Sequence, residues 1–409
     1  DTALARALGR DLRASARLDW SPGKPVGLTG LDLSGGDYAL SGDVSLHGVE
    51  GAVELSADTD LRVRAQDLSR FAGLAGRPLH GGADIAMRGT VQPVSGSFDL
   101  AVEGRTRDLA IGDATLDPLL RGTTTLSLTA RRDTGGTAIE SLALSNPALN
   151  LDGSARLAPD AGQARLSVRL SDLGLLAEGI SGPASATIAA NHAGGPWALT
   201  LDAEGPGGTR MRAEGRVAQD AAHADLSMTG QAPLALINGQ IRPRRASGTA
   251  QFDLRLDGAP GLAALSGTVS TRDARVTLPN QRLALGRIDA QARLAGGRAE
   301  LDVTSTLSTG GRVRLSGPVR LSPPFDADLS LALRRAALHE PGLFKTNADG
   351  NLAIRGPLAG GARIGGEITL GEVEMRVPET SGPSYGDLPG LRHVGEPAAV
   401  HRSRVRAGL

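Results

Sequence analysis

The chain has 409 residues with 44 basic and 44 acidic side chains, so its formal net charge is zero, and it contains no cysteine. The charges are spread evenly, which leaves no basic patch or stripe of the kind that nucleic acid requires. The lack of cysteine excludes disulfides, thiol catalysis and cysteine-based metal sites.

Aromatic residues are unusually scarce for a chain of this size. They make up only 2% of the sequence, although 40% of it is hydrophobic. Large compact cores usually draw on aromatics, because each one buries roughly 150–250 Å². A thin object without a deep centre can be built from aliphatic residues alone. The composition therefore predicts an elongated repeat architecture rather than a compact one.

Residues 1–27 are predicted to form a short helix and a lead-in. Leu4, Leu8 and Leu12 recur every four residues within residues 2–17, which places them on one face of a helix. The start carries neither a signal-peptide pattern nor a run of the ~20 apolar residues that spans a bilayer. We expect any membrane anchor to lie outside this chain.

Residues 28–378 repeat a short run in which every second residue is apolar, followed by Gly, Pro or Asp. In one such run, Leu166, Val168 and Leu170 alternate with polar residues. Successive side chains of a strand point to opposite faces, so the pattern predicts a sheet with one apolar and one wet face. The short connections favour antiparallel neighbours, because parallel strands need longer crossovers.

Four Leu-rich stretches interrupt the alternation. They are predicted to be short helices or loops that lead the chain to the next sheet segment, and they cover residues 67–77, 171–181, 231–241 and 336–346. Their spacing is irregular, which indicates a degenerate repeat.

The fold class that follows is all-β: an elongated, curled antiparallel sheet forming a U-shaped trough, with a few short helices or loops between sheet segments. About two dozen strands at ~4.8 Å spacing would extend on the order of 100 Å. Residues 379–409 are rich in Pro and Gly and lack the alternation. They are predicted to be a linker to a further, C-terminal domain.

The residues offer no convincing catalytic centre. None of the seven His belongs to an HxH or HExxH pattern, and the carboxylates alternate with apolar residues as expected for a solvated sheet face. The one G-x-S-x-G match, at Gly382–Gly386, lacks the strand and helix that a nucleophile elbow needs. We expect no enzymatic activity, no cofactor and no metal.

The apolar face is therefore the candidate functional site. It could be the dry core between two sheets, or an open trough for acyl chains. The scarcity of aromatics favours the trough, because a lipid would fill the volume that bulky side chains fill in a sandwich. The residues predicted to line it are Leu126, Leu128, Leu142, Leu144, Leu166, Val168, Leu170, Leu199, Leu201, Phe252, Leu254, Leu256, Leu329, Leu331, Leu333, Leu352, Ile354, Ile368 and Leu370.

Three segments resemble the TamB branch of the bacterial AsmA-like proteins. They are the turn at residues 67–84, the segment at residues 365–380 and the stretch at residues 391–409, which is similar to the linker upstream of the C-terminal domain in some members. The alternation covers nearly the whole chain, whereas these segments cover a minority of it.

This resemblance implies a setting for the apolar face. Such proteins are anchored in the inner membrane by an N-terminal helix and cross the periplasm as a curled sheet with a hydrophobic groove. They are implicated in phospholipid transport and in outer-membrane protein assembly together with an outer-membrane barrel partner. The resemblance implies phospholipid acyl chains as ligand, with the barrel and both membranes reached only through regions outside this chain.

Two other function classes remain open from the sequence. One is a structural or adhesive β protein with a closed, dry core. The other is an extended β-helix enzyme acting on polysaccharide, which would need carboxylates converging on one exposed face.

Overall fold

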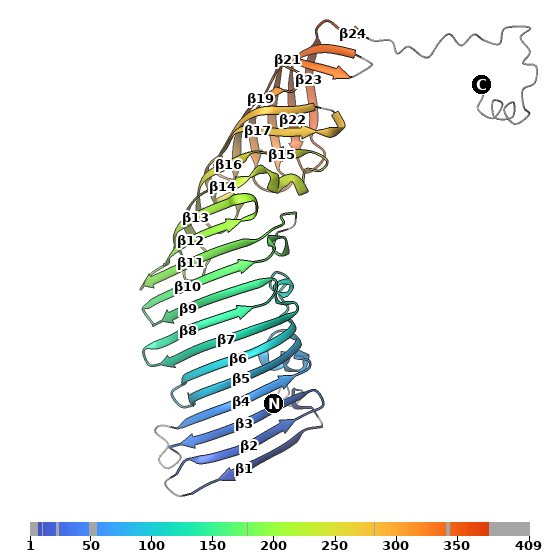
Figure 1. Cartoon of the computed structure of the whole chain (residues 1–409). Helices are drawn as coiled ribbons and strands as arrows, with labels where there is room; N and C mark the ends of the chain where they lie inside the picture. Colours follow the sequence, from blue (N-terminus) through green and yellow to red (C-terminus); the bar gives the residue numbers. More distant parts are fainter. Residues whose placement is uncertain are drawn as a thin grey trace, which may run out of the picture.

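A computed structural model describes residues 7–9, 11–21, 24–48, 55–177, 179–281, 283–340 and 344–375. Within them the chain forms one open antiparallel sheet of 24 strands (Figure 1). The ribbon is long and curled, and it runs from β1 at one end to β23 and β24 at the other. The predicted all-β fold, an elongated antiparallel sheet that is not closed into a barrel, is confirmed.

The strands of the first half of the chain are short to medium in length and follow one another closely. They are β1 (Arg13–Asp19), β2 (Val26–Ser34), β3 (Tyr38–His47), β4 (Ser56–Ala65), β5 (His80–Gln92), β6 (Ser97–Ala110), β7 (Thr123–Asp133), β8 (Gly136–Ser145), β9 (Leu149–Leu157), β10 (Ala161–Leu170), β11 (Ala184–Ala193) and β12 (Trp197–Gly205).

The second half continues in the same way. Its strands are β13 (Thr209–Val217), β14 (Ala224–Pro233), β15 (Arg245–Ser247), β16 (Thr249–Gly258), β17 (Leu265–Leu278), β18 (Leu283–Ala295), β19 (Arg298–Leu307), β20 (Arg312–Arg320), β21 (Asp326–Glu340), β22 (Phe344–Pro357), β23 (Arg363–Leu370) and β24 (Glu374–Met375).

The topology is a simple meander in which strands pair with their neighbours in the sequence. β15 and β16 lie end to end beside β17, separated by Gly248, and β24 pairs with the start of β22 beyond the end of β23. All of the described strands belong to this one sheet, which forms one curled ribbon in Figure 1. The described residues therefore form a single layer.

The two long edges of the sheet differ. One, which we call the hairpin edge, is closed by tight turns such as those at residues 134–135 and 296–297. The other, which we call the capped edge, carries longer connections with short helical turns, seen along one side of the ribbon in Figure 1. The helical turns are η1 (Ser69–Phe71), α2 (Ala72–Ala75), η2 (Asp117–Leu120), η3 (Leu173–Leu175), η4 (Pro206–Gly208), η5 (Leu234–Gly239) and η7 (Pro279–Gln281), whereas η6 (Leu262–Ala264) belongs to the hairpin edge.

The helix predicted over residues 2–17 is wrong for its second half. Ala7 and Leu8 are helical, but Arg13–Asp19 form β1. The ladder with β2 supplies backbone hydrogen bonds to this segment and outweighs its local helical spacing, because tertiary pairing overrides weak propensity. Residues 1–6 lie outside the described part of the chain.

Three of the four predicted interruptions contain helical turns, and the fourth prediction is wrong for residues 336–340 and 344–346, which are strand, whereas residues 341–343 lie outside the described part of the chain. η1 with α2, η3 and η5 fall at the first three sites. At the fourth site β21 continues to Glu340 and β22 begins at Phe344, so the ladder goes on. The connection with η2 was not among the predicted interruptions, although it carries Leu116, Leu119 and Leu120. The linker predicted at 379–409, like the G-x-S-x-G match, lies outside the described residues.

Many of the buried side chains of the sheet follow the capped edge in what we call the buried seam, whereas others, such as Ala213 and Ala224, lie elsewhere. The side chains of the buried seam are mostly small, and they are Tyr38, Ala65, Ala83, Thr124, Leu149, Leu170, Ala246, Ala274, Ile288, Ala336 and Ala348. Near its middle, Leu119 of η2 packs against Leu149 and Leu170. Burying a leucine contributes roughly 1.5–3 kcal/mol, so the connections of the capped edge contribute to the core by covering one margin of the sheet.

Candidate functional site: the apolar face

The strand ladder brings all of the predicted groove residues to one face of the sheet, which we call the apolar face. Directly paired residues of an antiparallel ladder point to the same side. Leu128 pairs with Leu142, Leu166 with Ile188, and Leu331 with Leu352. The same reasoning, followed from strand to strand, connects the predicted residues from Leu126 on β7 to Leu370 on β23.

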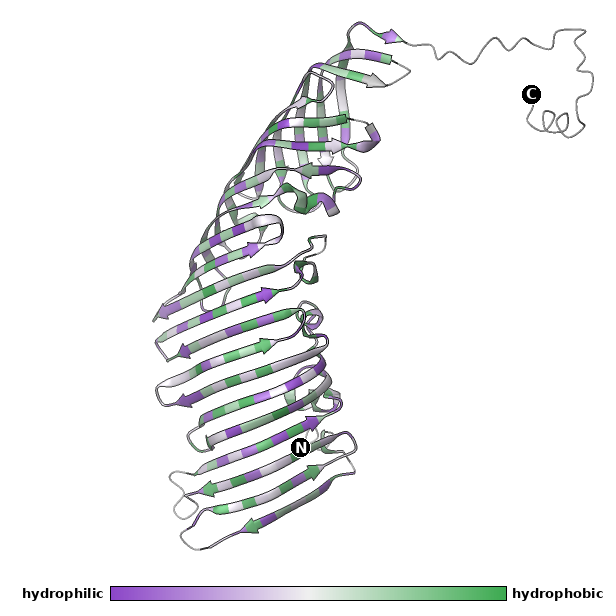
Figure 2. Cartoon of the chain, in the orientation of Figure 1, coloured by the Kyte–Doolittle hydropathy of each residue, from purple (hydrophilic) through white to green (hydrophobic). Residues whose placement is uncertain are grey.

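The alternation that predicted this face is visible along the strands. Green and purple segments alternate along most of the ribbon in Figure 2. On β10, Leu166 and Val168 are half-buried and Leu170 is buried, whereas Arg165 and Arg169 are exposed. At the last long strand the apolar face is open, with Ile364 68% exposed and Ile368 49% exposed. That these residues line a lipid groove stays a prediction.

No second sheet layer covers this face within the described residues. Only the connections of the capped edge fold over its margin, as Leu119 does. Monomeric proteins rarely expose long contiguous apolar surfaces unless these bind a partner, a membrane or a ligand. An apolar face of this length therefore indicates a binding surface.

A set of glycines inside the strands shapes the apolar face, and sequence reasoning missed it by treating Gly mainly as a turn residue. These residues stand at apolar positions of the alternation and are Gly42, Gly89, Gly104, Gly153, Gly215, Gly230, Gly267, Gly317, Gly350 and Gly366. Several are flanked by large side chains on both neighbouring strands: Gly153 lies between Leu142 and Leu166.

At all of these positions except Gly153, a side chain cannot replace the glycine without moving its surroundings. A Cβ on Gly215 would come within 2.0 Å of the carbonyl oxygen of Asp225, and one on Gly42 within 1.9 Å of that of Asp60. Gly215 also has φ of 154°, a conformation that other residues rarely adopt. Glycine kinks of this kind, together with bulges, allow a sheet to curve.

The opposite, polar face is covered by pairs of arginine and aspartate on neighbouring strands. Arg62 donates to Asp84 at 2.7 Å, Arg255 to Asp225 at 3.0 Å, and Arg314 to Asp302 at 3.0 Å. The hydrogen bond from Arg62 lowers the pKa of Asp84. Exposed pairs contribute only about 0.2–1 kcal/mol each, so their main effect is to favour the register in which this face meets water.

The polar face also carries hollows. One of about 970 Å³ spans β11 to β17 and is lined mainly by charged and hydroxyl side chains, among them Asp202, Glu204, Arg210, Arg212 and Asp253. Its lining is unsuitable for acyl chains, so this hollow does not belong to the candidate site.

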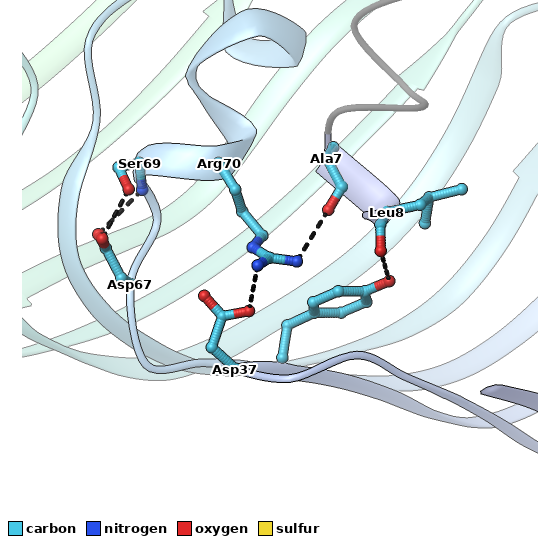
Figure 3. Close-up of polar contacts among 7 residues, drawn as sticks. Ala7, Leu8, Asp37, Asp67, Ser69 and Arg70 are labelled. Carbon is cyan, nitrogen blue, oxygen red and sulfur yellow. Dashed lines mark hydrogen bonds and ion pairs between the residues drawn. The ribbon is translucent and has the colours of Figure 1, made fainter. Parts of the chain in front are cut away.

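At the N-terminal end, a cluster of polar contacts holds the first described residues against the capped edge (Figure 3). Arg70 of η1 forms an ion pair with Asp37 at 2.7 Å and donates to the carbonyl oxygen of Ala7 at 3.3 Å. Its guanidinium also lies 5.1 Å from the ring centre of Tyr38, whose hydroxyl donates to the carbonyl oxygen of Leu8 at 2.8 Å. Ala7 is fully buried as a result.

Groups that could hold a metal are not assembled in the described residues. No three side chains of His, Asp or Glu lie close enough there to hold a metal ion. The rings of His192 and Trp197 lie 4.4 Å apart between their centres and are tilted by 59° to each other, which is a packing contact at the hairpin edge. None of the helical segments in the described ranges is long and apolar enough to cross a membrane.

Comparison with known proteins gives one match. A family model for type II secretion system protein N matches residues 189–347, from within β11 to within β22. No curated protein and no solved structure matches the chain. The match covers less than half of the chain and is not to the TamB branch, for which the comparisons give no evidence. The central part of this sheet is therefore similar to a bacterial secretion protein.

Proposed function

We propose that the apolar face carries the acyl chains of phospholipids and that the chain is a segment of a route between the inner and outer membranes. The observation that carries this proposal is the continuous apolar face on a single-layer sheet. Withdrawing acyl chains from water contributes roughly 0.8 kcal/mol per buried CH₂. A face of leucine and valine interrupted by glycine notches can supply that burial without binding one molecule tightly.

The glycines support a trough rather than a flat surface. Where a sheet curls, the side chains of its inner face crowd together, and a glycine at that point removes the obstacle. The glycines described above stand at apolar positions, with Gly230 between Met211 and Phe252. This arrangement favours curvature with the apolar face inside and the arginine–aspartate pairs outside.

The two alternatives from the sequence are less well supported. A dry core needs a second layer over the apolar face, and the described residues provide only connections along one margin. A β-helix enzyme needs a different architecture, since this sheet is an antiparallel meander. The match to a secretion protein is compatible with a periplasmic location and with outer-membrane assembly. The inner-membrane anchor and the barrel partner implied by the TamB resemblance remain part of the proposal.

Site-specific photo-crosslinking tests the proposal. A photoreactive residue at Val168, on the apolar face, should capture phospholipid that is identified by mass spectrometry after extraction. The matched control is Arg169, the adjacent residue on the opposite face of β10. Equal capture at both positions, or a purified protein without any bound lipid by native mass spectrometry, would contradict lipid carriage and favour a structural role.

A further inference from the structure

The polar face holds a group of four arginines at the capped edge between β18 and β21. Arg287, Arg312, Arg334 and Arg335 line one hollow of about 370 Å³ together with Thr306. Some arginines elsewhere on the polar face, such as Arg314 and Arg355, form ion pairs with aspartate, whereas Arg298 and Arg320, which pair directly across β19 and β20, form none among the described residues. None of the four arginines of the hollow has an ion-pair partner among the described residues.

The register of the strands makes this grouping costly. Arg312 pairs directly with Arg334 across β20 and β21, so two like charges stand opposite each other. Like charges at such positions are destabilising. Arg312 also pairs with Thr306 on β19, which completes a row across three strands.

The remaining two arginines flank this row at bulges in the ladder. Arg287 and Arg335 have φ of 46° and 47°, a left-handed conformation that residues other than glycine rarely adopt. Each lies where the register shifts, between Gly286 and Asp289 on β18 and between Leu333 and Ala336 on β21. The same left-handed conformation occurs at Asp108 and Asp273 along the capped edge, so what distinguishes this place is that two such residues line one hollow.

The backbone around the hollow is fixed by its neighbours. Arg335 donates its amide to Asp349 at 3.0 Å, so that carboxylate is already engaged by the backbone. The turn at residues 308–311 is tied to the strands on both sides, with the amide of Ala337 donating to the carbonyl of Gly310 at 2.9 Å and that of Ser308 donating to the carbonyl of Ala284 at 2.8 Å. A Cβ on Gly311 would come within 2.1 Å of the carbonyl oxygen of Arg335, so the turn packs closely against the bulge.

We propose that Arg287, Arg312, Arg334 and Arg335 form a binding site for a phosphate group. Guanidinium groups bind phosphate oxygens through paired hydrogen bonds, and a dianion would relieve the repulsion between Arg312 and Arg334. The hollow is large enough, because a water molecule takes about 30 Å³ and a phosphate group the space of a few. The phosphate can belong to a lipid headgroup or be free in solution. The proposal rests on the polar face and does not depend on lipid carriage by the apolar face.

Titration with inorganic phosphate, at constant ionic strength, tests the site. The double variant Arg312→Gln with Arg334→Gln should bind inorganic phosphate at least tenfold more weakly than the wild type by calorimetry. The matched control, Arg314→Gln with Arg355→Gln, removes the same charge from the same face and from ion-paired positions. The control should retain wild-type affinity.

A second arm identifies the source of the phosphate. Co-sedimentation is measured with vesicles of phosphatidylcholine alone and with vesicles containing one quarter phosphatidylglycerol. Binding to the mixed vesicles that is lost in the double variant identifies a lipid headgroup. Binding of inorganic phosphate without vesicle binding identifies free phosphate. Equal behaviour of wild type and double variant in both arms, or no binding in either, would overturn the proposal.

A third variant separates the loss of phosphate binding from a loss of folding. Arg287→Asn removes one guanidinium and places a residue that tolerates φ of 46° at the bulge. It should weaken phosphate binding while its thermal midpoint without phosphate is equal to or above that of the wild type. Unchanged phosphate affinity in this folded variant would count against the site.

Discussion

The ring of Phe252 lies over Gly230 on the neighbouring strand. A Cβ on Gly230 would come within 2.5 Å of Phe252 Cζ and within 2.2 Å of the carbonyl oxygen of Arg210. Large and small residues thus complement each other across β13, β14 and β16, and the large side chain occupies the space that the glycine leaves open.

Gly230→Ala should destabilise this part of the sheet. The added methyl overlaps both Phe252 and the backbone of β13, and overpacking costs about 1–3 kcal/mol. We expect this destabilisation to appear as reduced hydrogen-exchange protection of the amides in β13, β14 and β16. Gly286→Ala is the control, because a Cβ there meets nothing within 4 Å. Equal protection in the two variants would show that the glycine positions do not constrain the sheet.

Leu254→Asp should abolish lipid capture near the middle of the apolar face. A carboxylate there would meet acyl chains without a partner, and removing it from water costs far more than a methylene contributes. The measurement is the amount of phospholipid that co-purifies or crosslinks to a probe on the adjacent strand. Gln251→Glu adds the same charge to the polar face of the same strand and should leave capture unchanged. Normal capture by Leu254→Asp would contradict our assignment of the face.

Asn146→Ala should release the connection that contains η2. The buried Asn146 side chain accepts the amides of Ala148 and Leu149 at 2.8 and 2.7 Å and donates to the carbonyl of Leu119 at 2.7 Å. Losing a buried hydrogen-bonding group costs about 1–3 kcal/mol for each partner left unsatisfied. Faster proteolysis within residues 111–122 is the expected result. The control is Asn150→Ala, at an exposed position on β9. This variant should be cleaved at the wild-type rate.

The connection at η3 should loosen in acid. Asp172 accepts the amides of Gly174 and Gly182 at 3.0 and 2.8 Å, and these backbone hydrogen bonds lower its pKa. A lowered pKa means that the stabilisation is complete above the unfolded value of about 3.9 and is lost as the pH falls through the folded value.

Amide exchange of Gly174 and Gly182, corrected for the intrinsic pH dependence, measures this effect. Protection should be constant above about pH 5 and should fall below about pH 4. Asp172→Asn removes the titrating group, so its protection should not vary over that range. The same acid-dependent loss in Asp172→Asn would show that another group controls the connection.

Much of the fold could be predicted from the sequence because strand alternation is a local property. Leu166, Val168 and Leu170 alternate with polar neighbours, and the pleat of any strand sends them to one side. The antiparallel meander followed from the short turns. The ladder places every predicted groove residue on one face, although their role in lipid binding remains to be tested.

Other features depended on pairing between strands. Residues 13–17 of a predicted helix belong to β1 because β2 pairs with them, and β21 extends into a predicted loop as far as Glu340 because β22 pairs with it. Gly215 and Gly230 lie inside strands rather than in turns. Only the neighbouring strands show this, because their backbones leave no room for a Cβ at either position.

The sequence by itself determined that this protein is a sheet with two chemically different faces. Only the tertiary structure decided that the apolar face has no second layer over it in the described residues, and that Arg312 stands opposite Arg334. The physical reason is that the alternation of side chains is set by the geometry of a single strand. Which residues cover the apolar face, and which charges stand opposite each other, depends instead on how separate strands pair and in which register.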